Sequence, residues 1–226
     1  MRILGGEARG RMLKTREGNG TRPTDARSRE TLFNIVGART QDARVLDLYA
    51  GSGSLGLESL SRGASSCLFI EQNAQACRAI GDNIRALKWE DHATIWQNSV
   101  KKALLRLVDK GERFDLILAD PPFDRAGELP ELCALLDNAT PLLHNGKKPF
   151  CGLLVIQHHW KAGVQLSAAY SRVQERRAGE SQLSFFELSP SELSHDETHD
   201  DSSNDDKTQI EYSSDDDSSS SPEINN

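Results

Sequence analysis

Between Arg44 and Gln157 the sequence alternates short apolar runs with longer amphipathic stretches, and this alternation constrains the fold more than any other feature. It predicts strands at 44–49, 66–71, 93–97, 114–119 and 151–157. It predicts helices near 54–62, 73–87, 99–108 and 127–138. Strands that alternate with helices at this spacing form parallel crossovers. We therefore expect an α/β fold with a doubly wound sheet and helices on both of its faces.

The segments on either side of this region have different patterns. Two apolar-containing runs at 2–4 and 11–14, separated by glycines, predict an N-terminal β-hairpin followed by a glycine-rich loop. Thr24 or Asp25 can then cap a helix that ends near Val36. The runs at 169–173 and 182–188 have no helix between them, so they predict a closing antiparallel strand pair.

The last part of the chain has a composition that cannot form a core. Beyond Pro190 it consists largely of Ser, Asp, Glu and Asn, and such a segment buries too little apolar surface to offset its chain entropy. We therefore predict three parts: an appendage of hairpin and helix at 1–38, a main domain at 39–188, and a disordered acidic tail at 189–226.

The charge is distributed unevenly between these parts. The whole chain carries −7, but the segment from Glu187 onward contributes −12, which leaves +5 for residues 1–186. A mildly basic domain is compatible with a polyanionic partner. The cysteines are Cys67, Cys77, Cys133 and Cys151, and their scattered spacing predicts free thiols and no metal site. Without a signal-peptide pattern or a membrane-length apolar run, we expect a soluble, cytoplasmic protein and a monomer.

A glycine-rich turn follows the first predicted strand of the main domain. The spacing Gly51-x-Gly53-x-x-Gly56 lets the backbone bend tightly and approach a ligand at the start of a helix. Asp47 precedes the turn and would repel a pyrophosphate, whereas it suits a cation. Glu71 ends the next strand, where an acid can accept both ribose hydroxyls of a nucleoside. These features favour S-adenosylmethionine over NAD as the bound cofactor.

The tetrapeptide Asp120-Pro121-Pro122-Phe123 follows the predicted strand 114–119. This pattern of an acid, two prolines and an aromatic residue suits methyl transfer to the exocyclic amine of a nucleic-acid base. Such an amine is a poor nucleophile because its lone pair is delocalised into the ring, so an enzyme must hold its N–H groups with acceptors. Asp120 and the Pro121 carbonyl can supply two acceptors on a backbone that the prolines make rigid. Phe123 can stack on the base. The alternative is a rigid exit turn with Phe123 in the core.

Four motifs together resemble one known family, the bacterial small-subunit (16S) ribosomal RNA guanine-N2 methyltransferases. The resemblance covers about residues 1–187 and rests on Arg22-Pro23-Thr24, on Arg27 with the run 29–34, on the run 47–58, and on Asp120–Phe123. It implies a Rossmann-like, seven-stranded class I methyltransferase fold with S-adenosylmethionine as donor. It also implies a guanine amine of ribosomal RNA as acceptor, within the small subunit or an assembly intermediate, and hence a role in ribosome biogenesis.

The expected site residues follow from these motifs. Donor-binding residues are expected at Asp47, Tyr49, Ala50, Gly51, Ser52, Gly53 and Glu71. Relatives commonly have an acid after the third strand to hold the adenine amine, whereas this chain has Asn98 and Ser99, either of which can accept a hydrogen bond. Asp120, Pro121, Pro122 and Phe123 are expected to hold the base. The same loop suits any planar amine, so an adenine-N6 methyltransferase of DNA remains an alternative.

Basic residues of the appendage are candidates for RNA docking, because arginine binds phosphates and stacks on unpaired bases. They are Arg9, Arg11, Arg22, Arg27 and Arg29. The simpler interpretation is a solvated, charged cover on the sheet, with Arg29 and Glu30 as an exposed helical pair. A noncatalytic, RNA-binding ribosome-assembly factor is a further alternative function.

Overall fold

The computed structural model describes residues 1–15, 26–123, 127–145 and 151–190. All of these residues belong to one compact unit, Met1–His195. The predicted caps Thr24 and Asp25, the glycine-rich loop before them and most of the acidic tail lie outside the described residues. The proposed division at residues 38 and 188 stays a prediction.

The predicted alternation of strands and helices is present along the whole central region. The strands are β1 (Arg44–Leu48), β2 (Ser66–Glu71), β3 (Ala93–Gln97), β4 (Leu116–Ala119), β5 (Leu153–His159), β6 (Tyr170–Ala178) and β7 (Ser181–Leu188). The helices are α1 (Ala26–Val36), α2 (Ser54–Ser61), α3 (Ala74–Leu87), α4 (Val100–Asp109) and α5 (Glu128–Asp137). Two 3₁₀ turns, Gly37–Thr40 and Thr140–Leu142, were not predicted.

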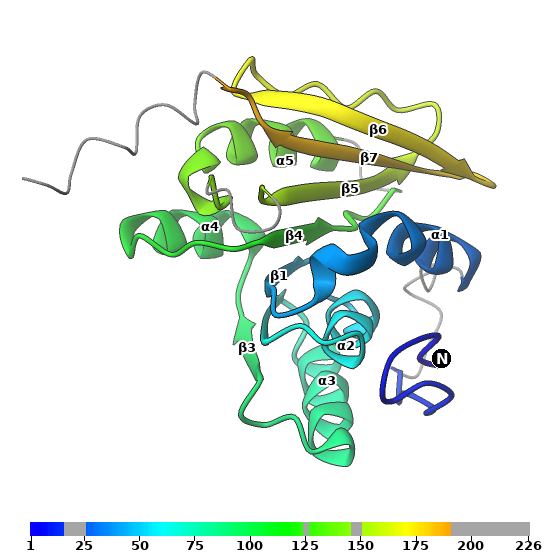
Figure 1. Cartoon of the computed structure of the whole chain (residues 1–226). Coiled ribbons are helices and arrows are strands. Elements are labelled where there is room, and N and C mark those ends of the chain that lie inside the picture. The colour runs from blue at the N-terminus through cyan, green and yellow to red at the C-terminus, as the bar shows by residue number, and fades with distance from the viewer. Residues whose placement is uncertain (16–25, 124–126, 146–150, 191–226) are drawn as a thin grey trace, which may run out of the picture. The chain divides into compact units, whose positions relative to one another are not determined.

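All seven strands form one sheet in the order β3-β2-β1-β4-β5-β7-β6 (Figure 1). The first five strands are parallel to one another, and β7 pairs antiparallel with both β5 and β6. The prediction of a doubly wound α/β sheet with a closing antiparallel pair is therefore confirmed.

Side chains that alternate along the strands separate two apolar layers. On β1, Val45 faces the layer that includes α1, α2 and α3, whereas Leu46 and Leu48 face the layer that includes α4 and α5. The same alternation holds along β2 and β4, because successive residues of a strand point to opposite faces. Burial of both faces explains why these strands read as continuous apolar runs in the sequence.

The ends of several elements differ from the prediction. β4 begins at Leu116 because Phe114 pairs with Leu143 in an isolated bridge outside the strand. β6 is longer than the predicted run at 169–173, and a register shift between Arg172 and Gln174 interrupts its pairing with β7. Its outward residues are charged, so apolar periodicity alone underestimated its length.

The N-terminal segment packs into the same core as the sheet. Its two predicted runs meet in a single antiparallel bridge, Arg2 to Met12, supported by hydrogen bonds between Ile3 and Arg11 and between Leu13 and Met1. Ile3 and Leu13 are buried in the apolar layer that also holds Phe33 of α1. The segment is thus an integral part of the layer beside α2 and α3, with little strand structure of its own.

Candidate functional site

The loops that carry the two main motifs leave adjacent strands at one edge of the sheet. β1 lies between β2 and β4, so the order of strands reverses direction at the β1–β4 pair. Open α/β sheets bind ligands at the carboxyl ends of strands beside such a reversal. The backbone N–H of Asp120 donates to the carbonyl of Leu48 at 3.5 Å, which links the loop after β4 to the end of β1. The glycine turn and the Asp120–Phe123 segment are therefore neighbours.

The glycine turn uses backbone conformations that favour glycine. Gly51 and Gly53 have φ values of 56° and 75°. Tyr49 adopts a φ of 60°, which is uncommon for a bulky residue and marks local strain at this turn. A Cβ atom built on Gly51 would meet nothing nearer than 3.8 Å, so the space above this residue is open. A ligand can therefore approach the backbone closely at Gly51.

Asp47 lies beneath the turn on the α2 side of the sheet and is buried. One carboxylate oxygen accepts a hydrogen bond from Gly56 N at 2.9 Å, which holds the first turn of α2. The other oxygen has no hydrogen-bond partner within the described part of the chain. Burial raises the pKa of Asp47 to about 8, and the charges of Asp120 and Glu71 act in the same direction, against the Gly56 hydrogen bond.

Glu71 ends β2 and reaches toward the glycine turn. Its carboxylate accepts from Gly51 N at 2.8 Å and from Asn73 N at 2.6 Å. The side chain of Asn73, not Glu71, caps α3 by accepting from Gln75 N and Ala76 N. Glu71 is only partly buried, so a ribose could still hydrogen-bond to the free lone pairs of its carboxylate. A cofactor role for Glu71 stays a prediction.

Asn98 and Ser99 follow β3 at the same edge. Asn98 N donates to Glu71 O at 3.0 Å, so the loop after β3 is tied to the end of β2. The Asn98 side-chain oxygen accepts from Ser99 N at 3.0 Å, and the Ser99 hydroxyl caps α4 by accepting from Lys102 N at 3.4 Å. Both side chains are half-buried at the expected position, and their contact with adenine stays a prediction.

The proline loop presents an aromatic ring at the surface. Pro121 is buried and Pro122 is half-buried, which anchors the backbone of the loop. Phe123 is 38% exposed, so the alternative in which it belongs to the core is wrong. Its ring meets His159 edge to face, with 6.4 Å between the ring centroids and 81° between the planes.

The candidate RNA-docking arginines are in different environments. Arg9 and Arg27 are exposed, and Arg22 lies outside the described residues. The Arg11 guanidinium donates to the carbonyl of Ala86, in the last turn of α3. The opposite end of α3 begins beside Glu71, and a helix of 14 residues is about 20 Å long. Arg11 therefore lies toward the amino edge of the sheet, away from the proline loop.

The expectation that Arg29 contacts RNA is wrong. Arg29 is 2% exposed, and its guanidinium donates to the carbonyl of Arg2 at 2.7 Å. It also lies 3.7 Å from the carboxylate of Glu58, which is itself fully buried. A buried charge must be paired, so Arg29 fixes the N-terminal segment against α2 instead of facing solvent.

Glu58 is a structural residue that the sequence reasoning missed. Its two carboxylate oxygens accept from Leu4 N and Gly5 N, each at 2.8 Å, and from the Arg62 side chain at 2.8 Å. The sequence did contain an indication, because Glu58 is an acid between Leu57 and Leu60 in a short segment with no other charged residue. In the structure, every residue of α2 is buried. Glu58 thus joins the N-terminal segment to the helix that begins at the glycine turn.

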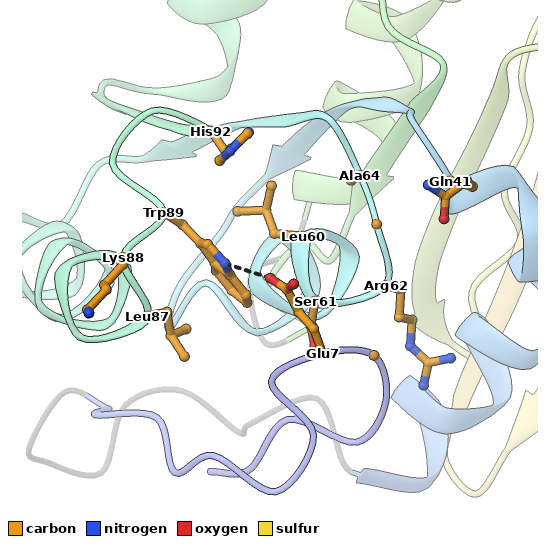
Figure 2. A pocket seen from close by; sticks show the side chains of 12 residues that line it. Glu7, Gln41, Leu60, Ser61, Arg62, Ala64, Leu87, Lys88, Trp89 and His92 are labelled. Atoms are coloured by element: carbon orange, nitrogen blue, oxygen red, sulfur yellow. Dashed lines mark hydrogen bonds between the residues drawn. The ribbon is translucent and has the colours of Figure 1, made fainter.

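A cavity of about 690 Å³ lies at the opposite, amino-terminal edge of the parallel strands. Figure 2 shows its lining from the N-terminal segment, the end of α2 and the end of α3, with Trp89 donating to the carboxylate of Glu7 at 2.9 Å. Gln41, Ala64 and His92, also in the lining, each come shortly before a parallel strand. Because parallel sheets bind substrates at the carboxyl edge, we assign the candidate site to the two loops above and not to this cavity.

Two other kinds of site receive no support from the residues that the structure describes. Within these ranges, no group of three or more His, Cys, Asp or Glu side chains is arranged to hold a metal ion. Among the described helices, none has the length and apolar character needed to cross a membrane.

Comparisons with known proteins identify chains of similar sequence and structure. Escherichia coli ribosomal RNA small subunit methyltransferase D is 36% identical over 189 residues, which cover 80% of this chain and 93% of the E. coli protein. The structure of a hypothetical protein from Thermus thermophilus has a TM-score of 0.70 and 31% identity, and the match covers 83% of this chain and 99% of that one.

A more distant structure shares the fold. SMU.776, solved in complex with SAH, matches with a TM-score of 0.57 and 12% identity, over 72% of this chain and 49% of that one. The family described as Conserved hypothetical protein 95 matches residues 1–187, the range that contains every motif discussed above. The seven-stranded sheet also matches the fold of solved methyltransferase structures. Because the family model covers most of the sequence, the chain belongs to this family.

Proposed function

We propose that the protein is a methyltransferase that transfers a methyl group from S-adenosylmethionine to the exocyclic N2 amine of a guanine in 16S ribosomal RNA. The observation that carries the proposal is the adjacency of the glycine turn and the Asp120–Phe123 loop at the β1–β4 pair. The relationship to the E. coli ribosomal RNA small subunit methyltransferase D supports the methyl transfer and the RNA substrate. The choice of guanine N2 rests on the resemblance of the motifs.

The glycine turn fits an adenosine-containing cation. Open space above Gly51 permits close approach, and Glu71 points a carboxylate at the same turn from β2. Asp47 has a buried oxygen without a hydrogen-bond partner among the described residues, which is better tolerated beside a positive charge. When bound here, S-adenosylmethionine supplies an electrophilic methyl group on a sulfonium.

The proline loop provides the groups that a planar amine requires. The Asp120 carboxylate and the Pro121 carbonyl accept the two N–H bonds of the amine and so fix the nitrogen. Buried Pro121 holds these acceptors in place, which lowers the cost of reorganisation during reaction. Asp120 then takes up the proton that the amine loses after it gains the methyl group. The exposed ring of Phe123 stacks on the extruded base.

The wider arrangement of the substrate is part of the same proposal. Arg9 and Arg27 are exposed and remain candidates for RNA docking, together with Arg22. The proposed partner is small-subunit ribosomal RNA, in the subunit or in an assembly intermediate, with the protein acting as a monomer. Because Arg29 is buried, it is no longer part of this set.

The direct test uses a donor that carries a labelled methyl group. The full-length protein is incubated with unmodified 16S ribosomal RNA, with small subunits that contain it, and with double-stranded DNA. Hydrolysis to nucleosides and mass spectrometry then identify the labelled product. We expect label in N2-methylguanosine from RNA. Label in N6-methyladenine from DNA would favour the alternative methyltransferase, and donor binding without transfer to any substrate would contradict the proposal.

A further inference from the structure

A group of aromatic and basic side chains lies beside the proline loop and has no role in the reaction proposed above. It consists of His159, Trp160, Lys161 and Arg177, which we name the aromatic-basic surface. We infer that this surface binds the unpaired RNA nucleotides that flank the methylated base. The inference rests on the proposed function for the identity of the partner, and its own evidence is the geometry of these four side chains.

The topology brings this surface to the edge where the proposed chemistry occurs. β5 is parallel to β4 and ends at His159, so its carboxyl end points the same way as the strand before Asp120. β7 begins opposite that end, where Ser181 pairs with His159. The turn between β6 and β7 therefore lies beside the end of β5 (Figure 1). Trp160 N donates to Glu180 O at 3.0 Å and fixes Trp160 against this turn.

The side chains form a continuous series of contacts that starts at the proline loop. Phe123 touches His159 edge to face, and the His159 ring stacks with Trp160 at 6.1 Å between centroids and 27° between planes. The Arg177 guanidinium lies 4.0 Å from the centroid of the Trp160 ring, and the Lys161 ammonium lies at 5.4 Å. If Phe123 holds the target base, the adjacent nucleotides of the same RNA strand would lie beside His159, Trp160 and Arg177.

The chemistry of the surface matches single-stranded RNA better than a purely structural role. Trp160 is 38% exposed although it is a large ring that would normally be buried. Single-stranded nucleic acid is bound by aromatic rings that stack on bases together with cations that contact phosphates. A guanidinium stacked on an indole keeps an outer face that can itself stack on a base. Arg177 donates from Nε to the carbonyl of Gly179 at 3.0 Å, whereas Arg172 on the same strand is paired with the carboxylate of Glu175 at 2.9 Å.

Two pairs of variants test the surface by binding alone, with no need for methyl transfer. Trp160→Ala removes the ring, whereas Trp160→Phe keeps an aromatic face. Arg177→Ala removes the cation that covers the ring. Arg176→Ala is its matched control, because this exposed arginine precedes Arg177 on β6 and points to the opposite face. Each full-length variant is titrated with a short single-stranded oligoribonucleotide of mixed sequence, at several salt concentrations.

We expect Trp160→Ala to weaken RNA binding about tenfold and Trp160→Phe to retain most of the affinity. Arg177→Ala should weaken binding and lower the slope of log K against log salt by about 1, while Arg176→Ala should leave both unchanged. Binding of RNA should also quench the fluorescence of Trp160, and Trp160→Phe should abolish that quench. Donor affinity, measured by calorimetry, should be the same in all four variants.

The outcomes separate this inference from the proposed function. If the wild-type protein methylates RNA but Trp160→Ala and Arg177→Ala bind as tightly as Arg176→Ala, the aromatic-basic surface is not an RNA contact and the proposed function stands. If the variants weaken oligonucleotide binding but the wild-type protein transfers no methyl group to RNA, the surface is supported and the proposed reaction is wrong. A loss of RNA affinity accompanied by a lower unfolding temperature in Trp160→Ala alone would count against the surface.

Discussion

Three carboxyl groups, from β1, β2 and the loop after β4, lie at one edge of the sheet, and their positions determine what each can do. Asp47 is buried beneath the glycine turn, Glu71 is hydrogen-bonded to that turn, and Asp120 is partly exposed in the proline loop. Of the three, Asp120 alone belongs to the loop that we expect to hold the base. Asp120 is therefore the residue whose loss should affect the chemical step most strongly.

Replacing Asp120 with Ala should lower kcat about 100-fold, because the amine loses one of its two acceptors and the reaction loses its proton acceptor. Asp120→Asn keeps one acceptor oxygen and should lose less activity. Steady-state rates with labelled donor measure both effects. The dissociation constant of the donor should change little, and a large loss of donor affinity in both variants would show that Asp120 acts in the cofactor site instead.

The raised pKa of Asp47 predicts a specific dependence of stability on pH. The folded chain keeps this carboxyl protonated up to about pH 8, whereas the unfolded chain releases the proton near 3.8. The folded state therefore binds more protons between these values, and stability falls as the pH rises from about 4 to about 8. Asp47→Asn cannot ionise, so its stability should fall less over the same range.

Urea unfolding of the two proteins at a series of pH values, without donor, isolates this effect. The unfolding free energy of Asp47→Asn minus that of the wild type should increase as the pH rises from about 4 to about 8. Equal pH dependence in both proteins would show that Asp47 has an ordinary pKa. A saturating cationic donor should reduce the effect in the wild-type protein, because a nearby positive charge favours the ionised carboxylate.

At the scale of elements, the packing of α2 on β2 depends on a residue without a side chain. A Cβ atom built on Gly56 would lie 2.3 Å from the Phe69 ring and 2.6 Å from the Cys67 sulfur, both of which are buried. Gly56 N also donates to Asp47, so a shift of the helix would disturb the support of the glycine turn. The third glycine of the motif thus serves helix–strand contact more than ligand approach.

Gly56→Ala should therefore destabilise the protein by about 1–3 kcal/mol through overpacking. Gly81→Ala is the matched control in α3, because its added Cβ would meet nothing nearer than 3.6 Å. This second substitution should stabilise the protein by about 0.8 kcal/mol, since alanine is the better helix former. Unfolding free energies of the two variants should have opposite signs relative to the wild type, and equal signs would contradict this account.

The order and type of the central elements could be predicted because both faces of the sheet are covered. The predicted bounds of β2 and β3 agree with the observed ones. In both cases a short apolar run flanked by polar residues predicts a buried strand of that length. The glycine turn and the Asp120–Phe123 loop were also predicted, because closely spaced glycines and paired prolines indicate turns in a sequence. Both loops are short extensions of strands, so their adjacency follows from the strand order.

Other features depend on contacts between distant parts of the chain and could not be predicted from local pattern. Arg29 looked like a surface cation because nothing near it in the sequence shows that Glu58 would lie against it in the interior. Trp160 and Arg177 are separated by most of β6 and the segment before it, and only the pairing of β5, β6 and β7 brings them together. Long-range ion pairs and ring contacts are results of the fold and carry no periodic pattern.

At the scale of the whole molecule, the acidic tail reverses the sign of the charge. Residues 1–186 carry +5 whereas the full chain carries −7. We propose that the tail, whose acidic residues lie mostly outside the described part of the chain, limits nonspecific attraction to nucleic acid.

Deletion of residues 190–226 should raise the affinity for RNA of unrelated sequence at low salt, and the difference should disappear as salt increases. Filter binding of both proteins across a salt series measures it. The unfolding temperature of the truncated protein should stay close to that of the full chain, because the core ends with β7. If the salt slopes were identical, the tail would have no electrostatic role.

The reversal of strand order at β1 and β4 also affects how the protein acquires its activity. The two loops of the site are neighbours in space, yet α2, β2, α3, β3, α4 and β4 separate them along the chain. Contacts between distant segments form late, because the intervening chain must first be ordered. We therefore expect a refolding molecule to form helices before it can bind its ligands, so that the ability to bind donor and base together reports a completed sheet.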